Sequence, residues 1–138
     1  MLRNRNEQKG FTLIELLVVI AIIGLLASVV LLSLNSARAK SRDAKRLADV
    51  RQIASAMELY FNDSGTYPAA TADLRPNYIG VWPIYPTPTG DGSCGSQVTN
   101  YAFSTTPTST YYALPFCLGA QTGGYGAGVH TLTPAGIQ

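Results

Sequence analysis

The chain has 138 residues, which is enough for one small domain and one long helix. Its net charge is only +2, but nine of its ten Lys and Arg residues precede residue 52, and residues 76–138 hold the single charge of Asp91. A nucleic-acid interface needs Lys and Arg clustered along the binding face. The C-terminal half is therefore excluded as a nucleic-acid interface. A nearly uncharged surface suits packing in an assembly or exposure outside the cell.

Residues 16–32 contain no charge, and only Gly24 and Ser28 interrupt the apolar run. With its flanks the run exceeds about 18 residues, which predicts a membrane-spanning helix. A cleaved secretory signal is one alternative, since Ala37 and Ala39 offer a small-residue site, but such signals have an apolar core of about 7–15 residues. A plain membrane anchor is the other alternative, and it gives Glu15 no purpose.

The sequence KGFTLIE, residues 9–15, opens this run and places one carboxylate, Glu15, inside it. An ionisable residue within a span costs about 2.5–3.5 kcal/mol at the bilayer centre and indicates a function. The junction resembles that of the type IV pilin and pseudopilin family, a match that covers the first half of the chain. The turn GTYP at residues 65–68 resembles the corresponding turn of major pseudopilins.

The resemblance implies a chain of processing steps. A prepilin peptidase would cut between Gly10 and Phe11, the new amino group of Phe11 would be methylated, and the helices would bundle into a filament core. Glu15 would then pair with the Phe11 amine of a neighbouring subunit and set the register between subunits. The implied partners are the peptidase and methyltransferase, an assembly ATPase with its membrane platform, the bilayer before assembly, and further copies of the chain.

Two observations disagree on membrane topology. Six Lys and Arg follow the span while three precede it, and the positive-inside bias then favours a cytoplasmic C-terminal side. The two cysteines and the family resemblance favour a head outside the cytoplasmic membrane, in line with a later place on a cell-surface filament. We expect the second arrangement.

The apolar run continues into an amphipathic helix. No Pro or Gly occurs over residues 35–62, and apolar residues recur at steps of three and four, whereas Arg46, Asp49, Gln52 and Ser55 fall on other faces. We therefore expect one helix over about 11–62, stopped by Gly65. The predicted layout is a leader (1–10), a transmembrane or filament-core half (11–34), an amphipathic half (35–62) and a β-rich head (63–138).

The head is predicted to be a small antiparallel sheet packed on the helix, which makes the fold α+β. The candidate strands are 78–82, 101–104, 111–118 and 129–132. In the third, alternate side chains from Tyr112 to Leu118 would face the helix, and Pro115 indicates an edge strand or a bulge. A glycine-rich loop precedes the last strand.

Both cysteines, Cys94 and Cys117, lie in the head. In an oxidising compartment they would form one bridge that contributes about 3 kcal/mol, and two buried thiols are the alternative. The basic cluster from Arg38 to Arg51 could contact lipid head groups, neighbouring subunits or DNA. We interpret it instead as a solvated helix face.

No pattern predicts an enzyme, a cofactor or a metal site. The sequence GDGSCG at residues 90–95 matches G-x-G-x-x-G, but it has no preceding strand and no following helix, so it predicts a turn. His130 is the single histidine, and G-x-S-x-G is absent. Major pseudopilins often bind calcium through acidic residues in a C-terminal loop, whereas Asp91 is the sole carboxylate here after Asp73.

The expected function is therefore that of a prepilin, a structural subunit polymerised into a type IV pilus or a related filament. A pseudopilin of a type II secretion or competence system is the alternative within the same class. A membrane-anchored binding domain that does not polymerise is the alternative from another class.

Overall fold

A computed structural model describes residues 10–95 and 97–138, so the expected leader lies outside the described residues except for Gly10. The elements in chain order are α1 (Leu13–Ser64), η1 (Thr71–Leu74), η2 (Gly92–Cys94), β1 (Leu114–Leu118), β2 (Gly128–Thr133) and β3 (Gly136–Ile137). The predicted α+β class, one long helix and a small antiparallel sheet, is confirmed. By internal contacts the chain separates into one unit that ends at Ser36 and another over residues 37–138.

Helix α1 is continuous over 52 residues, as predicted within two residues at each end. At its start the Glu15 amide donates to Thr12 Oγ1 (3.2 Å), and Glu15 Oε2 accepts from the Thr12 amide (2.9 Å). This reciprocal capping box satisfies amides that the first turn leaves unpaired. At its end Gly65 has φ +72°, and its amide donates to the Phe61 carbonyl (2.8 Å), so a residue free to adopt a left-handed conformation closes the helix.

The first half of α1 presents apolar side chains on all sides, and residues 11–34 are exposed throughout. The most apolar 18-residue window has a mean hydropathy of 3.0 and no buried residue, so its length and composition suffice to cross a membrane. An apolar surface of this extent does not remain in water, because soluble proteins rarely expose contiguous apolar patches above a few hundred Å². Lipid or protein must therefore cover it.

The sheet has the order β1-β2-β3 with antiparallel pairs, and the register places Phe116 opposite His130 and Leu132 opposite Ile137. β1 is an edge strand, as Pro115 indicated. Two predicted strands are absent. Residues 78–82 begin in a turn, where Tyr78 and Ile79 donate to the Leu74 carbonyl, and Pro83, Pro86 and Pro88 follow without amides for a ladder. Residues 101–104 make one backbone hydrogen bond to the chain before β1, from Ser104 to Ala113.

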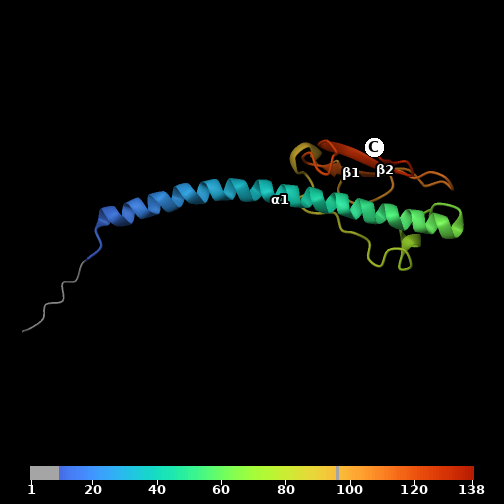
Figure 1. The fold of residues 1–138 in the computed structure, drawn as a ribbon, viewed down its shortest axis with the longest axis horizontal. Helices are drawn as coiled ribbons and strands as arrows, with labels where there is room; N and C mark the ends of the chain where they lie inside the picture. The colour runs from blue at the N-terminus through green and yellow to red at the C-terminus, as the bar shows by residue number, and fades with distance from the viewer. Residues whose placement is uncertain (1–9, 96) are drawn as a thin grey trace, which may run out of the picture. The chain divides into compact units, whose positions relative to one another are not determined.

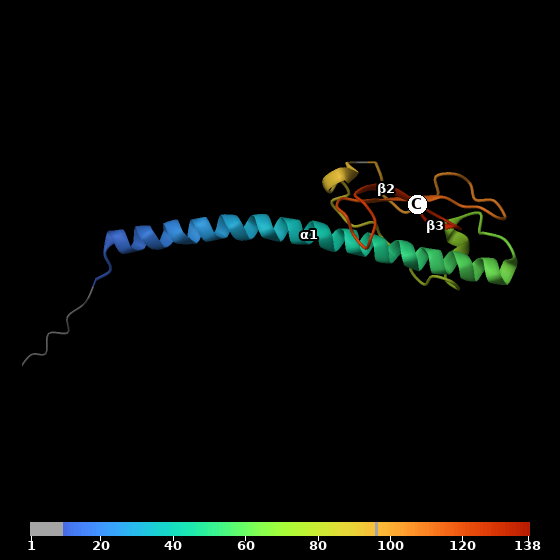
Figure 2. The same cartoon turned by 45° about the horizontal axis from the view of Figure 1, so that its top comes forward.

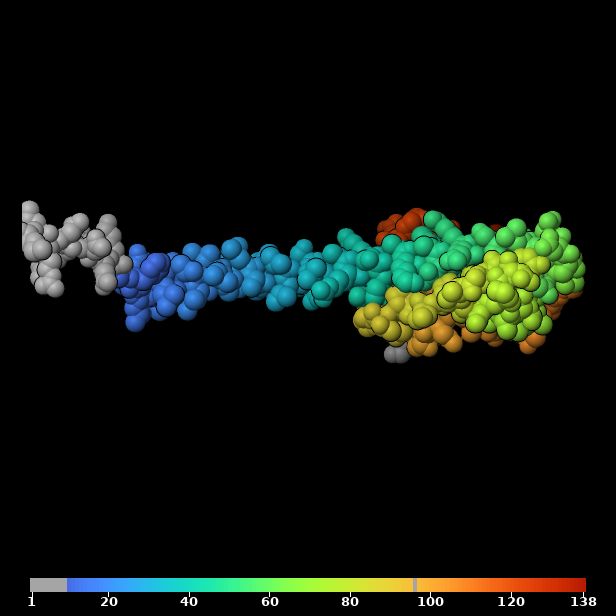
Figure 3. Space-filling model, turned by 90° about the horizontal axis from the view of Figure 1, so that it is seen from below, coloured from blue at the N-terminus to red at the C-terminus, as the bar shows by residue number. Residues whose placement is uncertain are grey.

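The core of the head forms between the second half of α1 and the sheet, which lie side by side in both cartoon views (Figures 1 and 2). The helix contributes the predicted stripe, and β1 contributes alternate side chains that are buried as expected. The segment over residues 65–90 lies along another side of the same helix half (Figure 3). The fully buried members of this core include Val50, Ile53, Met57, Leu74, Leu114, Phe116 and Leu118.

The central place of the helix in this core gives a testable prediction. Ile53→Ala should lower the free energy of unfolding of the head by about 2–5 kcal/mol, because Ile53 is 0% exposed and the change leaves a cavity. Leu59→Ala, at a position 55% exposed on the same helix, should change it by less than about 0.5 kcal/mol. Denaturant titration of the full chain in detergent, followed by Trp82 fluorescence, measures both. Equal effects would contradict the packing described.

Candidate functional site

The N-terminal motif lies at the start of α1. Phe11 is 82% exposed, and open space surrounds Gly10 within 4 Å of where a side chain would project. Glu15 is exposed and accepts from both the amide (2.9 Å) and the hydroxyl (2.7 Å) of Thr12 through one oxygen, Oε2. Sequence analysis missed this cap, although Thr and Glu three residues apart before an apolar run are its signature. The cap fixes the carboxylate one turn from Phe11.

The head contains a second polar cluster, centred on Arg46. Its guanidinium is 0% exposed and contacts Asp43 Oδ1 (2.7 Å) and Asp91 Oδ2 (3.1 Å). It also donates to the carbonyl of Pro88 (3.0 Å) and lies 5.0 Å from the ring centroid of Tyr85, within cation–π range. A buried charge is tolerated only with such partners. Helix α1 is thereby joined to the loop that precedes η2.

The two carboxylates of this cluster, Asp43 and Asp91, also bind groups other than Arg46. Asp43 accepts from the amides of Gly119 (2.9 Å) and Ala120 (3.0 Å), which follow β1. Asp91 forms a bidentate pair with Arg42, through Nε (2.5 Å) and Nη2 (2.7 Å). The hydrogen bonds from Arg42 are the main reason that the pKa of Asp91 is lowered. We name Arg42, Asp43, Arg46 and Asp91 the ionic clasp.

The ionic clasp corrects two expectations. Arg46 and Asp49 were placed on polar faces of the helix, but Arg46 is fully buried and Asp49 is nearly so. The basic cluster is therefore not a uniformly solvated face, because three of its members form ion pairs, and two of these, Arg42 and Arg46, pair with Asp91 of the head. By helical spacing, Arg46 and Asp49 lie beside the apolar stripe that contains Val50 and Ile53. The acids and carbonyls that contact Arg46 include ones from distant loops, whose position no local sequence pattern predicts.

Cys94 and Cys117 form a disulfide beside the ionic clasp, with their Cα atoms 5.6 Å apart. The two backbones approach closely, since a side chain at Gly92 would place its Cβ 2.2 Å from the Gly119 carbonyl oxygen. Gly92 also has φ +52°, within the 3-10 turn η2. The GDGSCG sequence therefore forms the predicted turn, and Gly92 permits this close approach.

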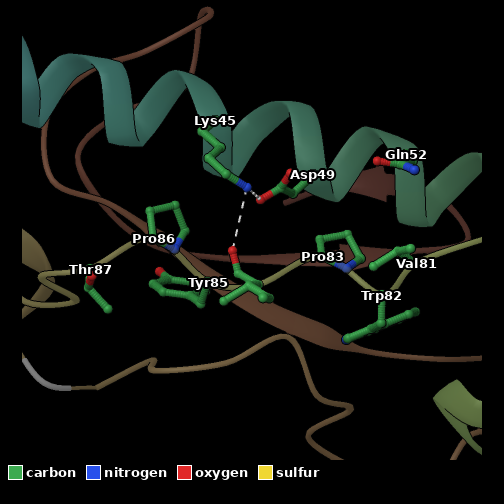
Figure 4. A pocket seen from close by; sticks show the side chains of 10 residues that line it. Lys45, Asp49, Gln52, Val81, Trp82, Pro83, Tyr85, Pro86 and Thr87 are labelled. Carbon is green, nitrogen blue, oxygen red and sulfur yellow. Dashed lines mark hydrogen bonds and ion pairs between the residues drawn. The ribbon is translucent and has the colours of Figure 1, made fainter.

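A shallow groove of about 490 Å³ lies between α1 and residues 81–87 (Figure 4). On the helix side Lys45 Nζ contacts Asp49 Oδ2 (2.8 Å), and both side chains point toward the loop. Asp49 also accepts from the buried Tyr101 hydroxyl (3.0 Å), and burial together with the nearby Asp49 charge raises the pKa of Tyr101. The groove thus has a structural ion pair at its rim.

Within residues 10–95 and 97–138, no three His, Cys, Asp or Glu residues gather to hold a metal ion. His130 lies against Phe116 and Tyr125, and one ring nitrogen is 2.8 Å from the Gly126 carbonyl oxygen. Asp91 is held by two arginines. The side chains with unusual environments therefore stabilise the head.

Comparisons with known proteins agree with this description. Residues 5–31 match the model of the prokaryotic N-terminal methylation motif. The chain is similar to type II secretion system core protein G of Escherichia coli strain K12, at 37% identity over 74 residues, 54% of this chain and 51% of that protein. The protein of that name from Pseudomonas aeruginosa is 36% identical over 71 residues, 51% of this chain and 50% of that protein.

The chain thus spans about half the length of the relatives it matches. No solved structure matches it significantly. The resemblance to the type IV pilin-like family is confirmed by the methylation motif and by these relatives.

The ionic clasp gives a second prediction. Asp91→Asn should lower the free energy of unfolding of the head by about 3–5 kcal/mol, because it leaves the buried Arg46 charge undercompensated. Asp91 has a lowered pKa when folded, so its contribution is present above about pH 4 and is lost as pH falls below that value. Denaturant titrations between pH 3 and pH 7 measure both effects.

The matched control is Asp73→Asn, since Asp73 is exposed and its carboxylate accepts from the Ala70 amide (2.9 Å) outside the ionic clasp. Asp73→Asn should lower the free energy of unfolding by about 1 kcal/mol or less. If Asp91→Asn proves no more harmful than the control, the ionic clasp does not stabilise the head.

Proposed function

We propose that this chain is the precursor of a structural subunit, cut between Gly10 and Phe11 and polymerised into a type IV pilus or a related filament. The observation that supports it best is the methylation motif at the start of a helix whose residues 11–34 are all exposed. Once such a helix leaves the bilayer, its apolar faces must be buried against one another or meet water. Polymerisation through these faces is therefore the expected mechanism.

The proposal includes the layout predicted from the sequence. Residues 1–10 would be the leader, 11–34 the transmembrane and later filament-core segment, 35–62 the amphipathic half of the helix, and 63–138 the head. The head would lie outside the cytoplasmic membrane, which the Cys94–Cys117 disulfide supports because such bonds persist in oxidising compartments. The pilin-like family indicates a structural and not a catalytic role.

The partners follow from this life cycle. A prepilin peptidase and a methyltransferase would act on Gly10 and Phe11, and the lipid bilayer would hold the subunit before assembly. An assembly ATPase with its membrane platform would drive extraction, and copies of the chain would cover the apolar helix.

A second candidate is a pseudopilin of a type II secretion system. The relatives named core protein G of that system favour it, with similarity over about half of this chain. Both candidates share processing and polymerisation, and they differ in the machinery that the filament serves.

Glu15 is proposed to register neighbouring subunits. Its Oε2 atom is engaged by Thr12, and no hydrogen bond within the described residues uses Oε1. That oxygen would remain for the Phe11 amine of an adjacent copy. Since both charges enter an apolar filament core, their pairing offsets a desolvation cost more than it adds stability, and its main effect is on register.

The processing step gives a third prediction. The native exported protein should lack residues 1–10, carry one methyl group on the Phe11 nitrogen, and lack the two thiol hydrogens of the bridged cysteines. Intact-mass measurement followed by N-terminal fragmentation measures all three changes. A mature protein that begins at Met1 or near Lys40 would exclude the proposed function.

The registration step gives a fourth prediction. Glu15→Gln should insert, be processed and fold, yet yield few filaments, because an unpaired amine in the apolar core costs several kcal/mol. Gln also serves at this position of a capping box, so the helix start is preserved and the charge alone changes. Sheared filaments are quantified against the processed subunit in the membrane.

The control is Thr12→Val, which removes the hydroxyl that bonds to Glu15 but keeps the carboxylate charge. It should assemble nearly as well as the wild type. Wild-type filament yield from Glu15→Gln would reject the pairing mechanism.

A further inference from the structure

The resemblance to major pseudopilins implies a calcium ion held by acidic residues in a C-terminal loop, and the residues of this chain do not fit such an ion. The loop between β1 and β2, residues 119–127, is rich in glycine and has no Asp or Glu. Calcium takes six to eight oxygen ligands, and carboxylates supply the negative charge among them. This loop must therefore be held in another way.

The loop is held from the helix side, by Asp43. The Asp43 carboxylate accepts from the amides of Gly119 (2.9 Å) and Ala120 (3.0 Å), where the loop begins. Further along, Gly123 packs so closely on α1 that a side chain there would collide with Leu47. Asp43 is 0% exposed, so its charge has to be compensated inside the head.

Arg46 supplies the compensating charge and carries the connection to a second loop. Its Nη1 donates to Asp43 Oδ1 (2.7 Å), and its Nη2 donates to Asp91 Oδ2 (3.1 Å). Nη2 also donates to the carbonyls of Pro88 (3.0 Å) and Thr89 (3.4 Å). One cation is thus surrounded by carboxylate and carbonyl oxygens, and oxygens of these kinds also hold Ca²⁺ in proteins.

The charges of the ionic clasp leave nothing for a divalent ion to neutralise. Its two guanidinium groups face its two carboxylates, so the formal charges cancel. Both oxygens of Asp91 accept from Arg42, and both oxygens of Asp43 accept from loop amides. A divalent ion added here would place two positive charges in the head without partners, which is costly.

We propose that Arg46 acts as a built-in cation that joins α1 to the loop before η2 and, through Asp43, to the loop after β1, so that this head folds and stays stable without calcium. A side chain thereby does what a bound divalent ion does in calcium-stabilised domains. The head would then be insensitive to the calcium concentration outside the cell. This role holds whether or not the chain polymerises.

Thermal unfolding of the full wild-type chain in detergent, followed by Trp82 fluorescence, tests the proposal directly. The chain is measured in excess EDTA and in calcium chloride at about 5 mM, above the ~10⁻³ M dissociation constant of weak extracellular calcium sites. Potassium chloride of equal ionic strength controls for screening. The unfolding midpoints should agree within about 2 °C.

Variants of Arg46 test whether its charge holds the loops. Arg46→Met keeps a long side chain but removes the charge, so the midpoint should fall by at least about 10 °C, because Asp43 and Asp91 lose a buried partner. Arg46→Lys keeps the charge without the planar fork, and the midpoint should fall by less. Arg51→Met is the matched control, since Arg51 is exposed on the same helix and should shift the midpoint by less than about 2 °C.

A wild-type midpoint that rises by more than about 2 °C in calcium, relative to potassium chloride, would overturn the proposal, and this measurement needs no variant to fold. The proposal would also be wrong if Arg46→Met were no more harmful than Arg46→Lys, because the charge would then not hold the loops. Failure of Arg46→Met to fold, with Arg46→Lys folded, would support it.

Discussion

The buried Arg46 guanidinium is the interaction on which the rest of the head depends. It joins the helix to the loop before η2, and its partner Asp43 holds the chain that leaves β1. The disulfide ties the same two loops a few residues away. A head with three short strands buries little surface of its own, so cross-links at this junction replace part of the missing core. The remaining core packs on the helix between these links and Gly65.

The long helix and its division into two halves could be predicted from the sequence, because hydrophobic periodicity and the absence of Pro and Gly are local signals. The β1 strand was predicted for the same reason. The strands expected at 78–82 and 101–104 were wrong, since apolar and aromatic residues there pack as extended loops without a neighbouring ladder. The burial of Arg46 depends on residues 42 to 45 positions away, which no local pattern reports.

For the N-terminal motif, the sequence and the structure contribute different information. The resemblance proposed roles for Gly10, Phe11 and Glu15, whereas the structure added the hydrogen bonds between Thr12 and Glu15. The two halves of the helix also divide two tasks. The apolar half offers affinity without direction, because hydrophobic burial is not directional. The second half makes directed contacts instead, because the ion pairs of Arg42 and Arg46 with Asp91 hold it to the head.

The position of the helix cap has a consequence for the timing of assembly. Phe11 lies immediately before Thr12, so a cut after Gly10 would create a positive amine beside the positive end of the helix dipole. Methylation of that amine would keep its charge. Proteolysis would thus place a positive charge at the end of the helix where the dipole disfavours it. A carboxylate brought close to the amine would reduce this repulsion. A neighbouring subunit would supply one, so the cut itself would favour assembly.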